Sequence, residues 1–230
     1  MKKKTAVTLI ISLLILVVVA MFTGRVFLPV VLKSAALNIL SSRLGAKVDI
    51  ADVKIISSRH IQFSDIRLSK KAAYDVSIKQ ADLESISFMT FFKGTPLNCD
   101  FRDFKMSQTG SALINGIASL LSMRPVDVLN FKDITFQLIS KDNQLIFKGL
   151  DARGNIIKVL ANGTIGKKNQ INYNLKLLLS KELTDQIPEK VREVFFKEAA
   201  GWSQIDLYVS GTNKKPFINL STGLFKLILR

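Results

Sequence analysis

The sequence has one imidazole, at His60, and one thiol, at Cys99, and either could act as a general base or a nucleophile. The nearest acidic residue after His60 is Asp65, and a solvated or cross-strand histidine explains His60 with fewer assumptions than catalysis does. Cys99 alternates with Leu97 and Phe101, which is typical of a small buried apolar residue. An enzyme would need one of these two groups to be exposed in a cleft.

Other patterns that carry chemistry are absent. The sequence has no Gly-x-Ser-x-Gly, P-loop, His-Glu-x-x-His or Gly-x-Gly-x-x-Gly motif. A single cysteine excludes a disulfide within the chain, and one Cys with one His leave too few ligands for a zinc site. Asn162-Gly163-Thr164 matches a glycosylation acceptor, which has meaning only in a secretory pathway. We therefore expect a non-enzymatic protein with no catalytic residue, no metal and no cofactor.

The composition limits the class of protein and its partners. The chain has 230 residues, of which 48% are hydrophobic, and this apolar content excludes intrinsic disorder. Its 33 Lys and Arg against 18 Asp and Glu give a formal charge of +15, which favours anionic partners such as phosphate-bearing lipid. Basic residues are scattered through the predicted strands rather than gathered with aromatics, so we expect no nucleic-acid binding.

Thr5 through Gly24 run for twenty residues without a charge, and three lysines precede them. As a helix this run spans roughly 30 Å, the hydrocarbon thickness of a bilayer. The lysines favour a cytoplasmic amino terminus and place the remainder outside the cytoplasm. A cleaved signal peptide is the alternative, because Val18-Val19-Ala20 offers a small residue at a plausible cleavage point. Apolar residues continue past that point, which argues against cleavage.

The sequence divides into three parts on this interpretation. Residues 1–25 form a cytoplasmic stub and a transmembrane helix, residues 26–45 a juxtamembrane helix, and residues 46–230 an extracytoplasmic curved β-sheet domain. The helix is expected over Pro29–Leu44, with Gly45 as its stop, and it either covers an end of the sheet or lies on the membrane surface. Without the first 25 residues the chain keeps 29 basic and 18 acidic residues, a charge of +11.

From Lys47 onward the dominant hydrophobic period is two, and the breaks between runs are short. Short breaks favour antiparallel hairpins, so the fold class predicted is mainly β, a curved antiparallel meander forming an open groove. The strands are expected at 47–57, 60–69, 74–88, 97–108, 128–140, 143–150, 154–165, 170–180, 202–211 and 216–229. Helical spacing recurs over Ser111–Ser122 and Lys181–Ala199, each expected as a lid over one face, with Pro188 either kinking the second or beginning its main part.

A pattern of apolar, any, Asp, apolar, any, apolar occurs four times, at Ile50–Ile55, Phe63–Leu68, Phe101–Met106 and Phe131–Phe136. In a flat strand the first and fourth residues would point to opposite faces. An added residue near the Asp, as in a β-bulge, would return both to one face and bend the strand. Coincidence is the alternative. Four aligned bends would curl the sheet around an apolar trough, which would mark a binding site.

The candidate residues of this trough are apolar positions on the predicted inner face. They are Ile55, Leu68, Ile78, Met106, Phe136, Leu138, Phe147 and Leu177.

Seven short segments carry a resemblance to the AsmA-like family of bacterial envelope proteins. They are Leu44–Val53 with Ile61–Leu68, Ala81–Phe88 with Phe91–Gly94 and Phe101–Phe104, and Ile205–Thr212 with Pro216–Ile218. The likeness covers roughly residues 1–106 and 202–225. It implies a single-pass inner-membrane protein with a periplasmic β-groove that carries phospholipid acyl chains toward the outer membrane. Members of the family are commonly longer, and ten strands about 4.8 Å apart make a trough of only about 48 Å.

Two functions follow as hypotheses. The first is a lipid-handling protein in which the sheet shelters acyl chains and Lys or Arg at its rim meets phosphate, with phospholipid, the inner membrane and other envelope proteins as partners. The second is a structural or adaptor protein of the envelope that docks a partner through an exposed edge strand. A closed core without a trough would favour the second.

Overall fold

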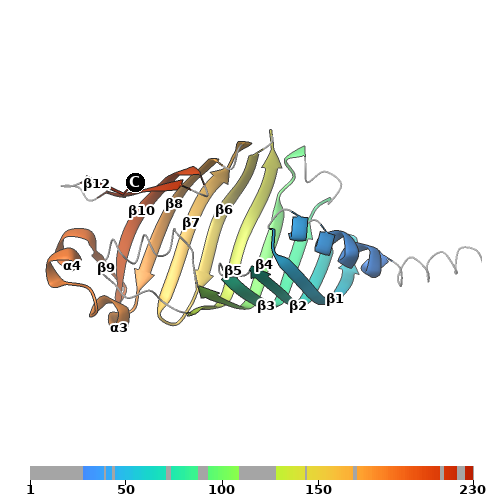
Figure 1. Ribbon diagram of the computed structural model, residues 1–230, viewed down its shortest axis with the longest axis horizontal. Coiled ribbons are helices and arrows are strands. Elements are labelled where there is room, and N and C mark those ends of the chain that lie inside the picture. The colour runs from blue at the N-terminus through green and yellow to red at the C-terminus, as the bar shows by residue number, and fades with distance from the viewer. Residues whose placement is uncertain are drawn as a thin grey trace, which may run out of the picture.

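The computed structural model describes residues 28–38, 40–42, 45–70, 74–87, 93–108, 128–142, 144–167, 170–212, 215–221 and 226–229. Its strands form one open antiparallel sheet, ordered as they occur in the chain from β1 to β8 and then β10, β11 and β12, with β9 pairing only β10 (Figure 1). The strands are β1 Lys47–Ser57, β2 His60–Lys70, β3 Tyr74–Ser85, β4 Leu97–Gln108, β5 Val128–Lys141, β6 Gln144–Arg153, β7 Ile157–Ile165, β8 Gln170–Leu179, β9 Lys197–Ala199, β10 Trp202–Thr212, β11 Lys215–Ser221 and β12 Lys226–Leu229.

The predicted open antiparallel meander is confirmed, because period-two runs separated by short turns pair with their neighbours in sequence. One strand prediction and the end of one helix prediction are wrong. The run 216–229 is split into β11 and β12, which pair with each other as a hairpin. Residues 197–199, expected at the end of a helix, form β9, because Gly201 at φ 78° turns the chain back and lets Lys197–Ala199 pair with β10.

The four Asp-containing motifs are not coincidental repeats, since they lie side by side at one level of the sheet. The ladders between β1 and β5 lack a pair at residues 51, 65, 79, 103 and 132, one in each strand. Asp65 and Asp103 adopt φ of 49° and 51°, a left-handed conformation that Asp tolerates better than most residues. Residues on both sides of the break, such as Ile50 and Val53, are buried in one cluster.

The expected return of the first and fourth apolar residues to one face is confirmed, with one unpaired residue at or before each Asp. The expected β-bulge is wrong, because neighbouring strands carry their unpaired residues at the same level and the register is unbroken there. A residue that does shift the register lies in β6, against both β5 and β7 around Gly149. Gly149 has φ 61°, which glycine adopts without steric cost, and its N–H donates to Asn162 Oδ1 at 2.7 Å. The side chain of Asn162 therefore holds the bulge in place.

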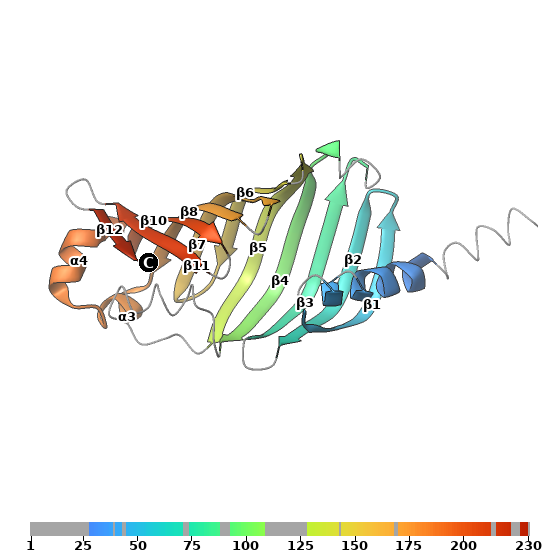
Figure 2. The ribbon, with the colours of Figure 1, turned by 45° about the horizontal axis from the view of Figure 1, so that its top comes forward.

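Residues 28–38 and 40–42 are helical, and this amino-terminal helix crosses β1 to β3 (Figure 2). Leu32, Ala36, Leu37 and Leu40 pack on the sheet, while Leu28, Val30 and Val31 are exposed. Gly45 ends the helix at φ 57°, and its N–H donates to the Ser41 carbonyl at 3.0 Å, as expected of a left-handed cap.

The opposite end of the sheet carries two short helices, α3 Lys181–Thr184 and α4 Glu189–Phe195 (Figure 1). Pro188 caps α4, so it begins the second part of the predicted helix and does not kink a continuous one. Leu183 and Ile187 are buried against β8 and β10, so this segment lies on the sheet as a lid.

Two predicted segments, the uncharged run Thr5–Gly24 and the helix Ser111–Ser122, lie outside the described residues. Within the described ranges, none of the helices is long and apolar enough to cross a membrane.

Candidate functional site

Cross-strand partners point to the same side of a sheet, so the register assigns every strand residue to one of two faces. One column joins nine strands through Val53, Phe63, Ala81, Phe101, Ile134, Ala152, Val159, Leu177 and Ile205. We call this side the apolar face and the opposite side the outer face. The outer face carries polar columns such as Gln62, Asp82, Asp100 and Thr135.

The register brings all eight predicted trough residues onto the apolar face. Ile55 and Phe136 share one column, Leu138 pairs with Phe147, and Leu68 and Met106 share a third column. Their surroundings differ. Ile78 and Leu177 are each 6% exposed and lie inside packed clusters, whereas the other six are partly exposed.

Both ends of the apolar face are covered by the chain itself. At the amino-terminal end, the helix over 28–42 packs on a cluster formed by Ile50, Val53, Ile66, Val76, Ile78 and Ala81. At the carboxyl-terminal end, α3 and α4 pack on β8, β10 and β11, and this cluster contains Leu179, Ile205 and Val209, all nearly inaccessible. The side chains at these two ends therefore serve packing.

The middle of the apolar face, over β4 to β7, is rich in aromatic rings. Phe101 and Phe136 meet edge to face with centroids 5.3 Å apart, and Phe104 lies 6.0 Å from Phe131. The Phe147 and Tyr173 rings lie 5.2 Å apart on either side of Gly163, whose missing side chain leaves room for the tyrosine ring. No described helix packs on the cluster of Phe131, Ile134 and Ala152 in the middle.

Accessible apolar side chains concentrate along one edge of this face, beside the turns that join β1 to β2, β3 to β4 and β5 to β6. Leu145 is 37% exposed, and its neighbours toward β1 are partly exposed. We call this set the apolar strip, and its members are Ile55, Ile61, Leu83, Phe136, Leu138, Leu145 and Phe147. It is a part of the face that an apolar ligand could reach.

The outer face carries the polar network that contains His60. The carboxylate of Asp82, itself only 8% exposed, accepts hydrogen bonds from His60 Nε2 at 2.8 Å, Gln62 Nε2 at 2.9 Å and Gln80 Nε2 at 2.6 Å. The second ring nitrogen of His60 lies 3.5 Å from Glu84. His60 is therefore the cross-strand histidine that the sequence favours, joined to β3.

The ionisation of Asp82 follows from these contacts. Burial by itself would raise the pKa of the carboxyl, but hydrogen bonds from Gln80, His60 and Gln62, with the charge of His60, outweigh it and leave the pKa below its usual value. Asp82 is thus held as a carboxylate, which suits a structural acceptor.

Cys99 cannot cooperate with His60. The thiol lies on the apolar face in the column of Ile61 and Leu83, while His60 belongs to the outer face. Cys99 is 5% exposed, and burial raises the pKa of its thiol to about 12, so the nucleophilic thiolate is scarce at neutral pH.

Nor does a metal site form among the described residues, which hold no group of three His, Cys, Asp or Glu side chains that could ligate one ion. The outer face has a hollow of about 650 Å³ near Asp82, where acidic Asp100 and basic Arg102 and Lys148 alternate. Such mixed charge gives no preference for an ion of either sign.

Comparison of the chain with protein-family models, with curated proteins and with solved structures yields no match.

Reasoning from the sequence missed Ile61, Leu83 and Leu145 as parts of the accessible surface. The period-two pattern contains them, because each stands two residues from another apolar-face position or opposite one. The pattern does not show which apolar positions stay accessible, because that depends on where the lids lie in the folded structure.

Proposed function

We propose that this chain is an inner-membrane-anchored periplasmic protein that binds phospholipid acyl chains on the apolar strip. It contributes in this way to lipid transport or outer-membrane biogenesis, as the resemblance to the AsmA-like family implies. No catalytic residue takes part in this function.

The apolar strip carries the proposal. Its seven side chains lie along one edge of the sheet on β1, β2, β3, β5 and β6, and Leu145 keeps more than a third of its surface exposed. An extended apolar surface that its own chain leaves accessible is typical of a binding site. A strip of this linear shape fits an extended ligand such as an acyl chain.

The driving force is the removal of methylene groups from water. Each CH₂ group that moves onto the strip contributes about 0.8 kcal/mol when it is fully buried. A sheet edge buries one side of a chain and gives only part of this value, so several methylenes must bind together. The aromatic rings of Phe136 and Phe147 enlarge the contact, since large rings dominate apolar interfaces.

The amino-terminal helix supports the proposed placement at a membrane. Leu28, Val30 and Val31 are exposed in this helix, and only residues 25–27 separate Leu28 from the uncharged run Thr5–Gly24. Apolar residues that neither pack on the sheet nor belong to a core are suited to a bilayer interface. The sheet would then begin close to the membrane that supplies the lipid.

The proposal is tested with two leucines of equal exposure on opposite faces. Leu145 on the apolar strip and Leu160 on the outer face of β7 are each 37% exposed, so Leu145→Glu and Leu160→Glu carry a similar folding cost. Full-length protein extracted in detergent is analysed by native mass spectrometry for bound phospholipid. We expect lipid on the wild type and on Leu160→Glu, and a large loss on Leu145→Glu.

Absence of lipid from the folded wild type contradicts the proposal, and so does equal loss from both variants. The adaptor function is the second candidate, because β1 is an eleven-residue strand paired only with β2 among the described elements. An exposed edge of this kind accepts a strand from another protein. Lipid-free, folded wild type would favour the adaptor.

A further inference from the structure

The two long edges of the sheet differ in charge. One edge is formed by the turns after β1, β3, β5, β7 and β10, and a basic residue lies in or directly beside each of these turns. We call Arg59, Lys93, Lys141, Lys167 and Lys215 the basic rim. All five are exposed. Among the described residues of these turns, Asp142 is the only acidic one.

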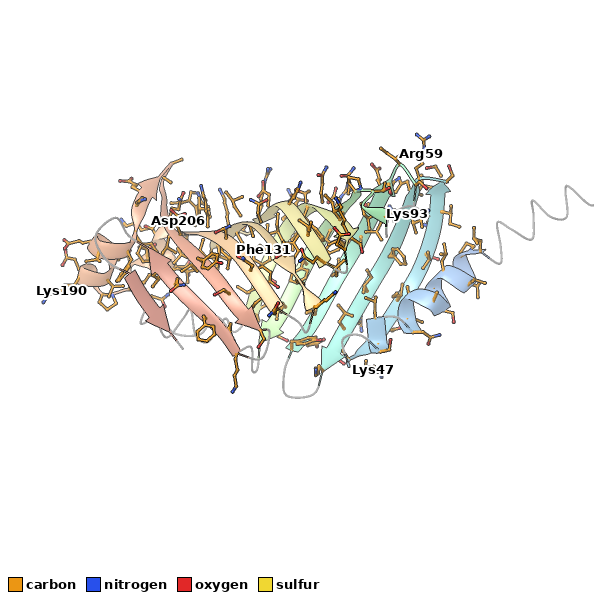
Figure 3. All side chains as sticks on the ribbon, turned by 90° about the horizontal axis from the view of Figure 1, so that it is seen from above. Lys47, Arg59, Lys93, Phe131, Lys190 and Asp206 are labelled. Atoms are coloured by element: carbon orange, nitrogen blue, oxygen red, sulfur yellow. The ribbon has the colours of Figure 1, made fainter. Side chains whose placement is uncertain are left out.

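The opposite edge is mixed. Its α3 and α4 segment from Lys181 to Glu198 holds four basic and five acidic residues. Cations there are partly neutralised, since Arg192 lies 3.4 Å from Asp185 and Arg153 lies 2.6 Å from Asp151. Figure 3 shows Arg59 and Lys93 together on the edge away from Lys47, where β1 begins.

The cations of the basic rim have no such partners. None of the five forms an ion pair with another residue in the part of the chain that the structure describes. Neighbouring turns also approach closely, because the position of a Cβ on Gly94, next to Lys93, would lie 3.8 Å from the Lys141 side chain. Like charges held near one another without a counter-ion favour an anion between them.

The basic rim adjoins the apolar strip. Leu145 stands four residues after Lys141, and Ile55 and Ile61 flank the turn that carries Arg59. Neighbouring turns are two strands apart, roughly 9.6 Å, so the five cations extend over roughly 38 Å. Arg59, Lys93 and Lys141 lie beside the strip, and Lys167 and Lys215 continue the row past β6. A ligand that lies on the strip and ends at this edge would place its head among unpaired cations.

We propose that the basic rim binds the phosphate headgroups of the phospholipids whose acyl chains lie on the apolar strip, and that it thereby selects anionic phospholipid. This inference rests on the proposed function and adds to it the orientation and the class of the lipid. Headgroups lie at the turns after β1, β3, β5, β7 and β10, and the mixed edge is left without them. A bilayer surface supplies the same phosphate chemistry, but the position of the rim beside the strip favours lipid already bound to the protein.

The test compares phosphatidylglycerol with phosphatidylcholine of identical acyl chains, offered as an equimolar mixture to full-length protein in neutral detergent. The rim variant is Lys93→Glu, Lys141→Glu and Lys167→Glu combined. The control combines Lys79→Glu, Lys105→Glu and Lys176→Glu, three exposed lysines away from the rim with the same change in net charge. Native mass spectrometry gives the ratio of the two lipids bound and their total.

We expect the wild type to prefer phosphatidylglycerol. The rim variant should lower the ratio by roughly fivefold or more, the effect of losing one lysine near an anionic phosphate, without abolishing total lipid. The control should keep the wild-type ratio. Raising the salt concentration should move the wild-type ratio toward that of the rim variant, because the contacts are exposed.

Each other outcome decides against the inference. An unchanged ratio in the rim variant overturns it, and so does an equal fall in the control, because net charge alone would then explain the preference. If folded wild type binds neither lipid, the proposed function itself fails and the inference fails with it. Should the rim variant not fold, as judged by circular dichroism, the corresponding Lys→Gln triple is measured in its place.

Discussion

The two ends of the apolar face and its accessible strip are built from the same residue types, yet they are used differently. At the carboxyl-terminal end, Ile205 and Val209 are almost completely buried beneath α3 and α4. Along the strip, Leu145 keeps over a third of its surface exposed. Hydrophobic character alone therefore does not tell which side chains pack in a core and which stay accessible to a ligand. The position of the lids decides this.

The largest expected effect compares one residue from each region. Ile205→Ala should lower the free energy of unfolding by about 2 to 5 kcal/mol, because it leaves a cavity in a packed cluster. Leu145→Ala should change it by only about 0.5 kcal/mol, as is usual for exposed positions. Urea unfolding of both full-length variants measures the two values. Equal losses would show that the strip is also a packed core.

A second variant tests how closely the backbones of β7 and β8 approach beside the Phe147 and Tyr173 rings. Gly163→Ala would place a methyl group 2.6 Å from the Asn172 carbonyl oxygen and against the Tyr173 ring, so we expect a loss of about 1 to 3 kcal/mol. Gly166→Ala is the control, since its nearest neighbours would lie 3.9 Å away. Thermal unfolding that does not distinguish the two would contradict a close approach of β7 and β8 at Gly163.

A third variant tests whether the outer face is independent of the strip. Asp82→Asn removes a buried charged acceptor and should cost about 1.5 kcal/mol at pH 7. The pKa of Asp82 is lowered in the folded state, so its stabilisation is present above the unfolded value of about 3.9 and is lost as the pH falls below it. The difference between wild type and variant should therefore shrink at pH 3.

Urea midpoints at pH 7 and pH 3 measure this change, with Asp142→Asn in the exposed β5–β6 turn as control. Bound lipid should not change in Asp82→Asn, because Asp82 faces away from the strip. Loss of lipid in this variant would mean that the two faces are coupled.

The smallest expected effect concerns the amino-terminal lid. Gly45→Ala forces a Cβ into the left-handed conformation at φ 57° and should cost about 1 kcal/mol. Gly45→Asn should cost less, because Asn tolerates this conformation. Calorimetric unfolding of both variants provides the comparison. An equal cost for the two would point to a steric clash of the side chain and not to the backbone angle.

Much of the sheet could be predicted from the sequence because its signals are local. Alternation in runs such as Lys47–Ser57, with short polar turns, identifies antiparallel strands that pair in chain order. The cap at Gly45 and the start of α4 after Pro188 have equally local causes. The short β9 escaped prediction, because three residues carry no period and their pairing depends on the turn at Gly201.

Bends in the sheet were predictable only in part. The Asp motifs correctly place residues such as Phe131 and Ile134 on one side, but the sequence does not reveal that the strands break together at one level and so keep their register. A residue that shifts the register occurs at Gly149, where the side chain of Asn162 from the next strand supplies the hydrogen bond. A contact between residues thirteen apart is decided by pairing and not by local preference.

By itself the sequence determined which residues share a face, because a period of two and short turns fix alternation and neighbour pairing. It also determined that the chain has one thiol and one imidazole to offer. Tertiary structure alone decided that Ile78 and Leu177 pack beneath lids, while Leu145 on the same face keeps over a third of its surface exposed. These outcomes depend on where distant segments fold back over the sheet, and burial of apolar surface by such segments has no signature in the run of residues that they cover.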